Sequence, residues 1–521
     1  MGLETEYAVR YTPRSRERPL KKTVFEFVAS VLVERLGGSP VRERFYLGNG
    51  GVVSLETPLN ETENCGLLEM ATPECAGPAQ LLLYQAAQDQ LLREALPLAQ
   101  ERLKQTWHYH GSLGLIKNCR DAQGEVYGVQ ENYEAIAGKG VSLWLRRLLL
   151  LPLTVPIVVY YAVCRSLQYS LEALSRLFKL DDTREEALFE SLRTVMFRLY
   201  PTVWYPVLLL LQLTCFVEAR RALTAFLVSR TIFIGSGTLN SDGTFEISER
   251  AAGIDNVFSW TPSGKPFYMV VNLVEGAADV LMGEREVGGL MSAVARLQLG
   301  CSEANMCERA EYLKLATTCL VLDMIESGEL SDAPRVADPV KAIKTVSKDL
   351  TLGTKLQLED GTEMTAVELQ RWYLGRARAF VEGASTVSLE AKELLKLWEK
   401  TLDQLESDPA ELFGCLDWVT KKLLLSRFQD RPLAARKKLD LKYHELVGGY
   451  HGTLVRAGLA ERLLSQEQIR LVMESPPRDT PALARVKALK ELAGTQARFS
   501  WESALVGSGR DRKVLRFRRR E

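Results

Sequence analysis

The sequence predicts an α+β fold in which helices pack on an antiparallel β-sheet. Several short segments alternate in polarity or carry β-branched residues and end at turn signals, which is typical of strands. These predicted strands are residues 3–9, 52–56, 67–71, 113–118, 124–133 and 231–234. Long helical patterns accompany them, and the clearest are residues 77–105 and 305–328. The presence of both patterns along the chain indicates the α+β class.

Composition limits the kinds of protein that this chain can be. It has 521 residues, of which 46% are apolar and 25% are charged, as in ordinary globular proteins. Lys plus Arg and Asp plus Glu both number 66, so no overall charge points to a nucleic-acid partner. Residues 510–520 form a basic tail, which is either a solvated end or a contact for an acidic surface or lipid.

Cysteine and histidine usage argues against two common site types. The nine cysteines include no Cys-x-x-Cys pair, and several lie in apolar runs, as expected of buried thiols in a reducing compartment. Only four histidines occur, which disfavours a histidine-based zinc site or a Ser-His-Asp triad. No secretory stretch precedes the first predicted strand, so we expect a cytoplasmic protein, with membrane association as an added possibility.

Two glutamates in the first predicted strand suggest a metal site. Glu4 and Glu6 are two positions apart, so they point to the same face of a strand, roughly 7 Å apart. Two carboxylates on one face repel each other unless a cation lies between them. Mg²⁺ takes oxygen ligands and commonly holds substrate phosphates as well. The strand therefore predicts a magnesium–nucleotide site on the sheet.

Residues 136–222 differ in character from the rest of the chain. Residues 148–164 and 199–217 contain no charged side chain, and a charged pattern typical of a helix pair separates them at residues 166–198. The apolar runs approach the length of a membrane-spanning helix, but prolines interrupt both. The alternatives are a hairpin in or on a membrane, and a hydrophobic insertion buried against the body or a second chain.

The chain therefore divides into four predicted regions. Residues 1–135 and 223–437 form the sheet domain, residues 136–222 are the helical insertion, and residues 438–521 are a small C-terminal α/β module with the basic tail. Further helices are predicted at residues 23–36, 339–348, 365–382, 388–406 and 409–426.

A series of motifs resembles one known family, the Pup ligases and depupylases. In order along the chain, they include Gly2-Leu-Glu-Thr-Glu-Tyr7, Asn49-Gly50, Glu69-Met-Ala-Thr-Pro-Glu-Cys75, Glu131-Asn-Tyr133, Ser248-Glu-Arg250, Ala304-Asn-Met306 and Asp417-Trp418. The resemblance covers nearly the whole chain except about residues 136–220. Each motif is short, and it is their order that makes the match specific.

The resemblance implies a fold like that of glutamine synthetase and other carboxylate–amine ligases. In such enzymes a curved antiparallel sheet holds ATP and Mg²⁺. A carboxylate takes the γ-phosphoryl group and becomes an acyl phosphate, because a carboxylate itself has no adequate leaving group. A substrate lysine then attacks to form an isopeptide bond, whereas depupylases hydrolyse that bond.

The resemblance also assigns roles to individual residues. By motif position, the metal ligands are Glu4, Glu6, Glu69 and Glu131; the candidate phosphate contacts are Arg230 and Arg250; and Trp418 either touches the nucleotide base or belongs to the core. The catalytic aspartate of the family, which accepts a proton from the amine, corresponds here to Glu56.

Some positions depart from the family pattern. Glu56 is one methylene longer than the aspartate, and two motif histidines are Gln130 and Gln298 here. A segment that handles nucleotide and metal in the family has no recognisable counterpart around residues 270–276, and the insertion has none in the family.

The sequence therefore leaves several functions open. Formation of an (iso)peptide bond leads, followed by a depupylase, amidohydrolase or phosphotransferase activity. The alternative from another class is a non-catalytic membrane-associated or interaction protein on an inherited scaffold. We expect the partner to be a Pup-like small protein or another carboxylate or amine substrate, with membrane or homo-oligomer contact through residues 143–220 and no nucleic acid.

Overall fold

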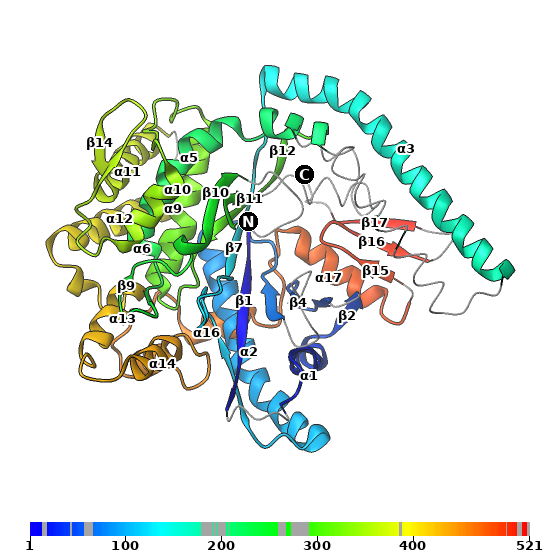
Figure 1. Cartoon of the computed structure of the whole chain (residues 1–521), viewed down its shortest axis with the longest axis horizontal. Helices are drawn as coiled ribbons and strands as arrows, with labels where there is room; N and C mark the ends of the chain where they lie inside the picture. Colours follow the sequence, from blue (N-terminus) through cyan, green and yellow to red (C-terminus); the bar gives the residue numbers. More distant parts are fainter. Residues whose placement is uncertain are drawn as a thin grey trace.

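The architecture was determined from a computed structural model of the chain (Figure 1). The structure describes residues 1–12, 18–41, 44–56, 66–178, 191, 194, 205–207, 209–258, 267–271, 291–384, 388–495, 497–507 and 513–517. Most of the predicted segment 166–198 beyond residue 178, and most of the segment around residues 270–276, lie outside these residues.

One large sheet forms the centre of the molecule. Its strands lie in the order β10-β11-β12-β7-β1-β5-β4-β3-β2, and β6 pairs with the far end of β1. In chain order they are β1 Gly2–Thr12, β2 Gly38–Val41, β3 Arg44–Leu47, β4 Val52–Glu56, β5 Leu67–Ala71, β6 Ser112–Ile116, β7 Val129–Ile136, β10 Ile254–Phe258, β11 Phe267–Val271 and β12 Val294–Ser302. All pairs are antiparallel except β10 with β11 at one edge, which is parallel. The predicted α+β class with an antiparallel sheet is confirmed, and the parallel edge pair was not foreseen.

Helices cover one face of this sheet (Figure 1). They are α1 Lys21–Leu36, α2 Pro78–Trp107, α5 Val217–Ser229, α6 Thr231–Ile234, α9 Glu308–Glu326, α10 Pro339–Lys348, α11 Ala366–Gly383, α12 Leu389–Ser407 and α13 Asp417–Ser426. Local sequence sets several of their starts. In α11 the Thr365 and Glu368 side chains form a reciprocal capping box, and in α10 Asp338 caps the helix ahead of Pro339.

The core consists of two main apolar clusters on the helical side. One joins α1 and α2 to β1, β4 and β5, and it includes Tyr7, Val28 and Leu92. The other is larger and joins α5, α9, α11 and α12 beneath β7 and β12, with Phe226 and Trp398 at its centre. A smaller apolar cluster on the opposite face joins Tyr46, Val52 and Ala71 to α17 (Pro481–Glu491) and the C-terminal sheet, and beside it β1 and β7 carry mainly polar side chains on that face.

The helical predictions outside residues 136–222 are confirmed with two corrections. Residues 231–234 were predicted as a strand because they are largely β-branched or aromatic, but they form the short helix α6 directly after α5, ending at Gly235. Residues 409–426 were predicted as one helix. They form a 3₁₀ turn, Pro409–Leu412, and then α13, with Gly414 at a φ of 76° between them.

The C-terminal part is closely joined to the body. It contains α14 Leu433–Tyr443, α15 Tyr450–Arg456, α16 Gln466–Val472 and α17 Pro481–Glu491, followed by the three-stranded sheet β15 Ala497–Phe499, β16 Ser503–Val506 and β17 Lys513–Arg516. Tyr443 and Leu454 belong to the same cluster as α1 and α2, and Glu445 forms a bridge to Ile116.

Within the part of the chain that the structure describes, one long helix leaves this body. It is α3, Gly140–Phe178, which begins four residues after β7 and extends away from the sheet along one side of the molecule (Figure 1). Pro152 and Pro156 lie inside it.

Candidate functional site

Alternation along β1 separates a buried face from an open one. Tyr7 points toward α2, where its hydroxyl donates to Asp89 Oδ1 at 2.7 Å. Glu4 and Glu6 have the opposite parity, so they point to the other face of the sheet, where α17 packs against the neighbouring residues Val52 and Ala71. This confirms that the two glutamates share one face of a strand.

The strand register gathers further carboxylates beside them. Glu6 lies opposite Glu69 in the β1–β5 pair, and residues that are directly opposite point the same way. Glu56 at the end of β4 lies two residues beyond Ser54, which is opposite Glu69, so it shares this face. The Glu56 side chain lies close enough to Glu6 to raise the pKa of that carboxyl. Four of the predicted site residues, Glu4, Glu6, Glu56 and Glu69, therefore form one carboxylate cluster.

The cluster shows the electrostatic signature of crowded acidic groups. Burial, and then repulsion from Glu56, raise the pKa of Glu6 well above its ordinary value, although Arg250 and the Gly128 amide oppose the rise. The Gly128 N–H donates to Glu6 Oε2 at 2.8 Å. Burial, with repulsion from Glu4 and Glu56, raises the pKa of Glu69 to about 8. A cation would relieve this repulsion, so the cluster is suited to bind one.

Polar side chains from β12 border the carboxylate cluster. Arg296 Nη2 lies 2.8 Å from Glu4 Oε1, and Arg296 Nε donates to Asn132 at 2.7 Å. Gln298 donates to Glu4 Oε2 at 3.2 Å and also to Gln130. Sequence reasoning missed Arg296 and Asn132. The alternating polarity of residues 294–302 predicts a strand, but it does not show which strand lies beside it.

Glu131 does not lie with the other predicted metal ligands. It is opposite Leu3 and Leu299 in the sheet, so its side chain points to the helical face. There its carboxylate pairs with Arg230 in a bidentate contact, at 2.6 and 3.0 Å, and both side chains are fully buried. Burial favours a higher pKa for Glu131, but the charge and hydrogen bonds of Arg230, together with Lys314 and Tyr133, lower the pKa below its ordinary value.

This geometry corrects the predicted roles of two residues. The guanidinium of Arg230 is engaged by Glu131 and also donates to Thr318 Oγ1 at 2.6 Å, so it is not directed toward a phosphate on the open face. The predicted metal role of Glu131 fails for the same reason: the strand register turns it away from the cluster.

The remaining two predicted contacts have different surroundings. Trp418 is fully buried and its Nε1 donates to the Ile232 carbonyl at 2.8 Å, so the core alternative describes it, and its predicted contact with a nucleotide base is corrected. Arg250 is also buried, and its Nε donates to the Gly300 carbonyl at 2.8 Å. It is close enough to Glu6 to lower that pKa, which places it at the edge of the carboxylate cluster.

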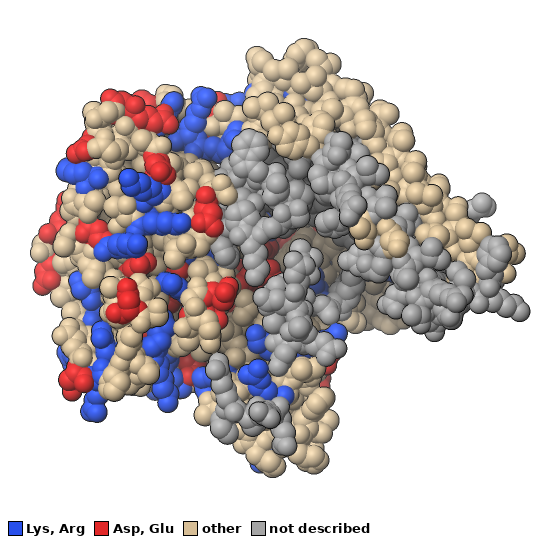
Figure 2. Space-filling view, in the orientation of Figure 1, with Lys and Arg blue, Asp and Glu red and all other residues tan. Residues whose placement is uncertain are grey.

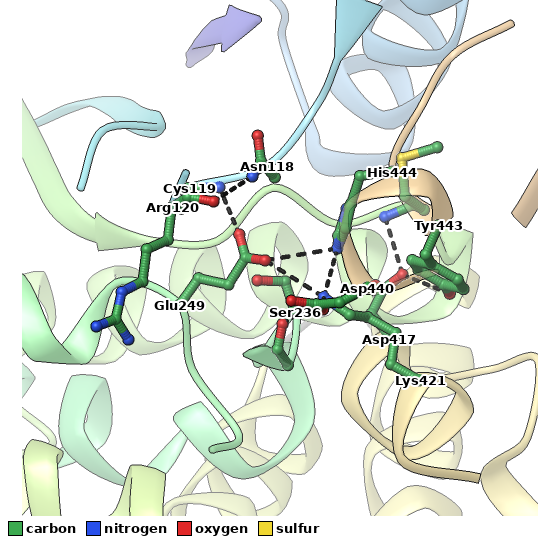
Figure 3. Close-up of polar contacts among 12 residues, drawn as sticks. Asn118, Cys119, Arg120, Ser236, Glu249, Asp417, Lys421, Asp440, Tyr443 and His444 are labelled. Atoms are coloured by element: carbon green, nitrogen blue, oxygen red, sulfur yellow. Dashed lines mark hydrogen bonds and ion pairs between the residues drawn. The ribbon is translucent and has the colours of Figure 1, made fainter. Parts of the chain in front are cut away.

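A second polar cluster lies inside the protein (Figure 3). Lys421 Nζ on α13 lies 2.6 Å from Asp440 Oδ1 on α14 and 3.3 Å from Glu249, and it contacts His444 Nε2 at 3.0 Å. All four side chains are almost completely buried. Lys421 thus joins α13 and α14 to the loop that carries Glu249 and Arg250.

The potential ligand group beside this cluster fits a metal poorly. Cys119, Glu249 and Glu303 have ligand atoms within 4.8 Å of one another. Glu303 already accepts from the hydroxyls of Ser236 and Ser248 and from two backbone amides, at 3.2 and 3.3 Å. Its oxygens are therefore occupied by protein donors, which is typical of a carboxylate that organises loops. In the carboxylate cluster Arg296 and Gln298 engage Glu4, but the repulsion among Glu6, Glu56 and Glu69 still makes that cluster the better candidate for a hard cation.

Comparison with known proteins assigns the chain to a family. Residues 1–505 match the family described as Pup-ligase protein. The chain belongs to that family. The resemblance predicted from the ordered motifs is thereby confirmed.

Individual relatives fall into two groups. The depupylase of Acidothermus cellulolyticus is 35% identical over 314 residues, which are 57% of this chain and 60% of that relative. The match thus spans about three fifths of its length. The Pup–protein ligase of Mycobacterium sp. strain KMS is 27% identical over 530 residues, with 99% of this chain and 95% of the relative covered.

Two solved structures share the fold. The complex between the prokaryotic ubiquitin-like protein Pup and its ligase PafA has a TM-score of 0.69 and 22% identity, covering 99% of this chain and 88% of that one. The Pup ligase PafA in complex with ADP has a TM-score of 0.65 and 22% identity, covering 94% and 89%. These likenesses support the predicted fold.

The carboxylate cluster predicts a specific pH dependence for this family member. Because the pKa of Glu69 is raised to about 8, its protonated form favours folding. That stability is fully present below the unfolded pKa, about 4.5, and is lost as the pH rises through the folded pKa. We expect the melting temperature in EDTA to fall by a few degrees between about pH 5 and pH 8.5, and Mg²⁺ to reverse part of the fall.

Scanning calorimetry of the wild type and Glu69→Gln, each with EDTA and with Mg²⁺, measures this effect. The variant has no ionisable group at residue 69, so its melting temperature should depend less on pH. An equally steep pH dependence in Glu69→Gln would contradict the assignment.

Proposed function

We propose that this protein is an ATP- and Mg²⁺-dependent ligase that joins a carboxylate of a Pup-like protein to an amine of a second substrate. The observation that carries the proposal is the gathering of Glu4, Glu6, Glu56 and Glu69 on the open face of the sheet. Its support is membership of the Pup-ligase protein family and a match to Pup–protein ligases over almost the whole length of both proteins. The solved relative bound to ADP supports the use of ATP.

The reaction proceeds in two balanced steps. A carboxylate oxygen of the Pup-like substrate attacks the γ-phosphorus of ATP, and ADP leaves, which forms an acyl phosphate. An amine nitrogen then attacks the acyl carbon, and inorganic phosphate leaves as the amide bond forms. The amine loses one proton in this step, so a base near the acyl carbon accelerates it.

Residues of the carboxylate cluster divide these tasks. Glu4, Glu6 and Glu69 are the oxygen donors for Mg²⁺, which when bound neutralises charge on the transferred phosphoryl group. Arg250 lies beside Glu6 at the edge of the cluster and is the candidate phosphate contact. Glu56 is the more exposed carboxylate and ends its strand, which suits a base that accepts the proton from an incoming amine.

Hydrolysis of an existing isopeptide bond is the second candidate. A depupylase is 35% identical to this chain, although it matches over a shorter stretch than the Pup–protein ligase does. Activation of water instead of an amine would use the same carboxylate cluster. Because free thiols are expected in a reducing compartment, the eight free cysteines among the described residues support action in the cytoplasm.

Conjugation by the wild type and Glu56→Gln tests the proposal. With Pup, ATP, Mg²⁺ and a lysine-bearing protein, we expect a covalent adduct on a denaturing gel and by mass spectrometry. Glutamine cannot accept the proton, so the conjugation rate should fall about 10²–10⁴-fold, while ADP affinity stays within about twofold of wild type.

The control is Glu101→Gln on the exposed side of α2, with a side chain far from the sheet face. It should conjugate at the wild-type rate. Release of Pup from a preformed conjugate without ligation would select the hydrolase instead. Absence of both reactions and of nucleotide binding would overturn the enzymatic proposal.

A further inference from the structure

The helix α3 exposes an unusually large apolar surface. It has 39 residues, and only 13% of its most apolar 18-residue stretch is buried. Leu151, Val155 and Val159 are 63%, 59% and 54% exposed, at successive positions four residues apart. Figure 2 shows this edge of the molecule as an extended surface free of Lys, Arg, Asp and Glu, in contrast to the mixed charges of the helical body.

The base of α3 is fixed to the protein body. Leu150 is fully buried in the larger core cluster, and Arg146 donates to the Ser292 carbonyl. Arg147 Nε donates to the Met291 carbonyl at 2.9 Å. The helix therefore projects from a firm attachment beside β12, and its exposed part is not needed to complete the core.

Two ordinary explanations for a long apolar helix do not apply. The core helix of a soluble protein is mostly buried, whereas α3 is mostly exposed. A signal sequence lies near an N-terminus, whereas α3 follows β7 in the middle of a folded domain. Among the described residues, α3 is the one helix with the length and composition to cross a membrane.

Exposed apolar side chains cover a wide part of the circumference of α3. Leu148 and Leu149 are both exposed, as are Val158 and Val159, so neighbouring residues on different sides of the helix reach solvent. A helix that pairs with another copy needs only a narrow apolar seam and keeps polar residues elsewhere. Residues 148–164 carry no charge and just one threonine among the apolar side chains and tyrosines, so no polar face is available.

The length of the free part of α3 suits insertion into one side of a bilayer. Beyond the buried Leu150, residues 151–164 carry no charge and span about 21 Å as a helix, which reaches into the ~30 Å hydrocarbon layer without crossing it. Arg165 follows this stretch in the sequence, and an arginine at the end of an apolar helix suits contact with lipid headgroups. Trp144, at the base and 61% exposed, is a residue type enriched at membrane interfaces.

The basic strand β17 provides a second, electrostatic attraction to a membrane surface. The strand β17, Lys513–Arg516, is exposed along its whole length and belongs to the basic stretch 510–520. Figure 1 shows β17 on the same side of the molecule as α3, away from α10–α12. Basic residues attract anionic headgroups, and stable anchoring generally takes two signals.

We propose that α3 inserts its apolar stretch into the hydrocarbon of a lipid bilayer and so holds this ligase-family protein at a membrane surface. This inference is independent of the catalytic proposal, because it depends on α3 and not on the carboxylate cluster. The alternative is that a second copy of the chain covers α3. The vesicle experiment below distinguishes binding to a bilayer from contact between copies.

Flotation of the purified full chain with vesicles tests the proposal. We use phosphatidylcholine vesicles at high salt, and vesicles that also contain phosphatidylglycerol at low salt. The wild type should float with both. Val155→Glu/Val159→Glu places two charges in the stretch, so its partition into neutral vesicles should fall at least about tenfold.

The matched control is Leu389→Glu/Leu471→Glu, which changes two exposed leucines on α12 and α16, 73% and 71% exposed. It should float like the wild type. Because both variants alter exposed residues, their melting temperatures should stay near that of the wild type. Brominated lipids should quench tryptophan fluorescence in the wild type more than in Trp144→Phe, which reports entry of the helix base into the bilayer interface.

Three results would overturn the proposal. The first is a wild type that stays unbound, or that binds only anionic vesicles at low salt, since the basic stretch alone would explain that. The second is a Val155→Glu/Val159→Glu variant that floats normally. The third is a defined oligomer that ignores vesicles and becomes monomeric in this variant, which would assign α3 to contact between copies.

Discussion

Glu6→Gln is expected to abolish Mg²⁺-dependent ATP turnover. Glutamine retains the size of the side chain, and its amide oxygen can still accept from the Gly128 N–H, which lies 2.8 Å from Glu6 Oε2. What is lost is the negative charge between Glu69 on β5 and Glu56 at the end of β4. Loss of one well-placed electrostatic group typically costs about 10²–10³-fold in rate.

ADP release measured across a Mg²⁺ titration distinguishes the metal role from a fold defect. We expect the variant to need a much higher Mg²⁺ concentration for any residual turnover. Its melting temperature in EDTA should be equal to or above that of the wild type, since one repelling carboxylate has been removed. Glu101→Gln, with an exposed carboxylate on α2, should match the wild type in both measurements. Unchanged Mg²⁺ dependence in Glu6→Gln would refute the metal role.

The second large effect concerns stability. Arg230→Met should destabilise the protein by about 3–5 kcal/mol, because it leaves the Glu131 carboxylate buried without its partner. The two side chains are fully buried and joined by contacts of 2.6 and 3.0 Å. The Tyr133 hydroxyl, which donates to Glu131 at 2.6 Å, cannot replace a full positive charge.

Urea unfolding of single and double variants isolates this pair. Arg230→Met/Glu131→Leu removes both charges, so it should recover much of the stability that Arg230→Met loses. The matched control is Arg371→Met, whose guanidinium forms a partly exposed pair with Asp403 at 2.5 Å, and which should cost about 0–1 kcal/mol. A double variant no more stable than Arg230→Met would show that the site needs the charged pair itself.

Local pattern was enough to predict much of the fold. The predicted strands 52–56 and 67–71 coincide with β4 and β5, and the long helix at 77–105 coincides with most of α2. Period-two alternation also placed Glu4 and Glu6 together correctly. These features depend on residues close in sequence, where periodicity and turn residues carry the information.

For other site residues, motif support alone did not reveal the face on which the strand register places the side chain. Glu131 has the same motif support as Glu69, yet β7 pairs with β1 so that Glu131 is opposite Leu3 and faces the helices. A shift by one residue would have placed it with Glu4, and no local pattern distinguishes the two registers. Arg296 was missed for the same reason, because its contact with Glu4 joins residues that are 292 positions apart.

That separation affects how the protein acquires its activity during synthesis. Glu4 and Glu6 lie on the central strand, which emerges from the ribosome before each of its sheet neighbours, and β12 is completed only at Ser302. Until then β7, the neighbour of β1, has a pairing edge without its native partner β12, and such edges readily join other chains. Long-range pairing of this kind also slows folding. The nascent chain therefore has a long interval in which it is inactive and prone to aggregate, and in which a chaperone would be of most use to it.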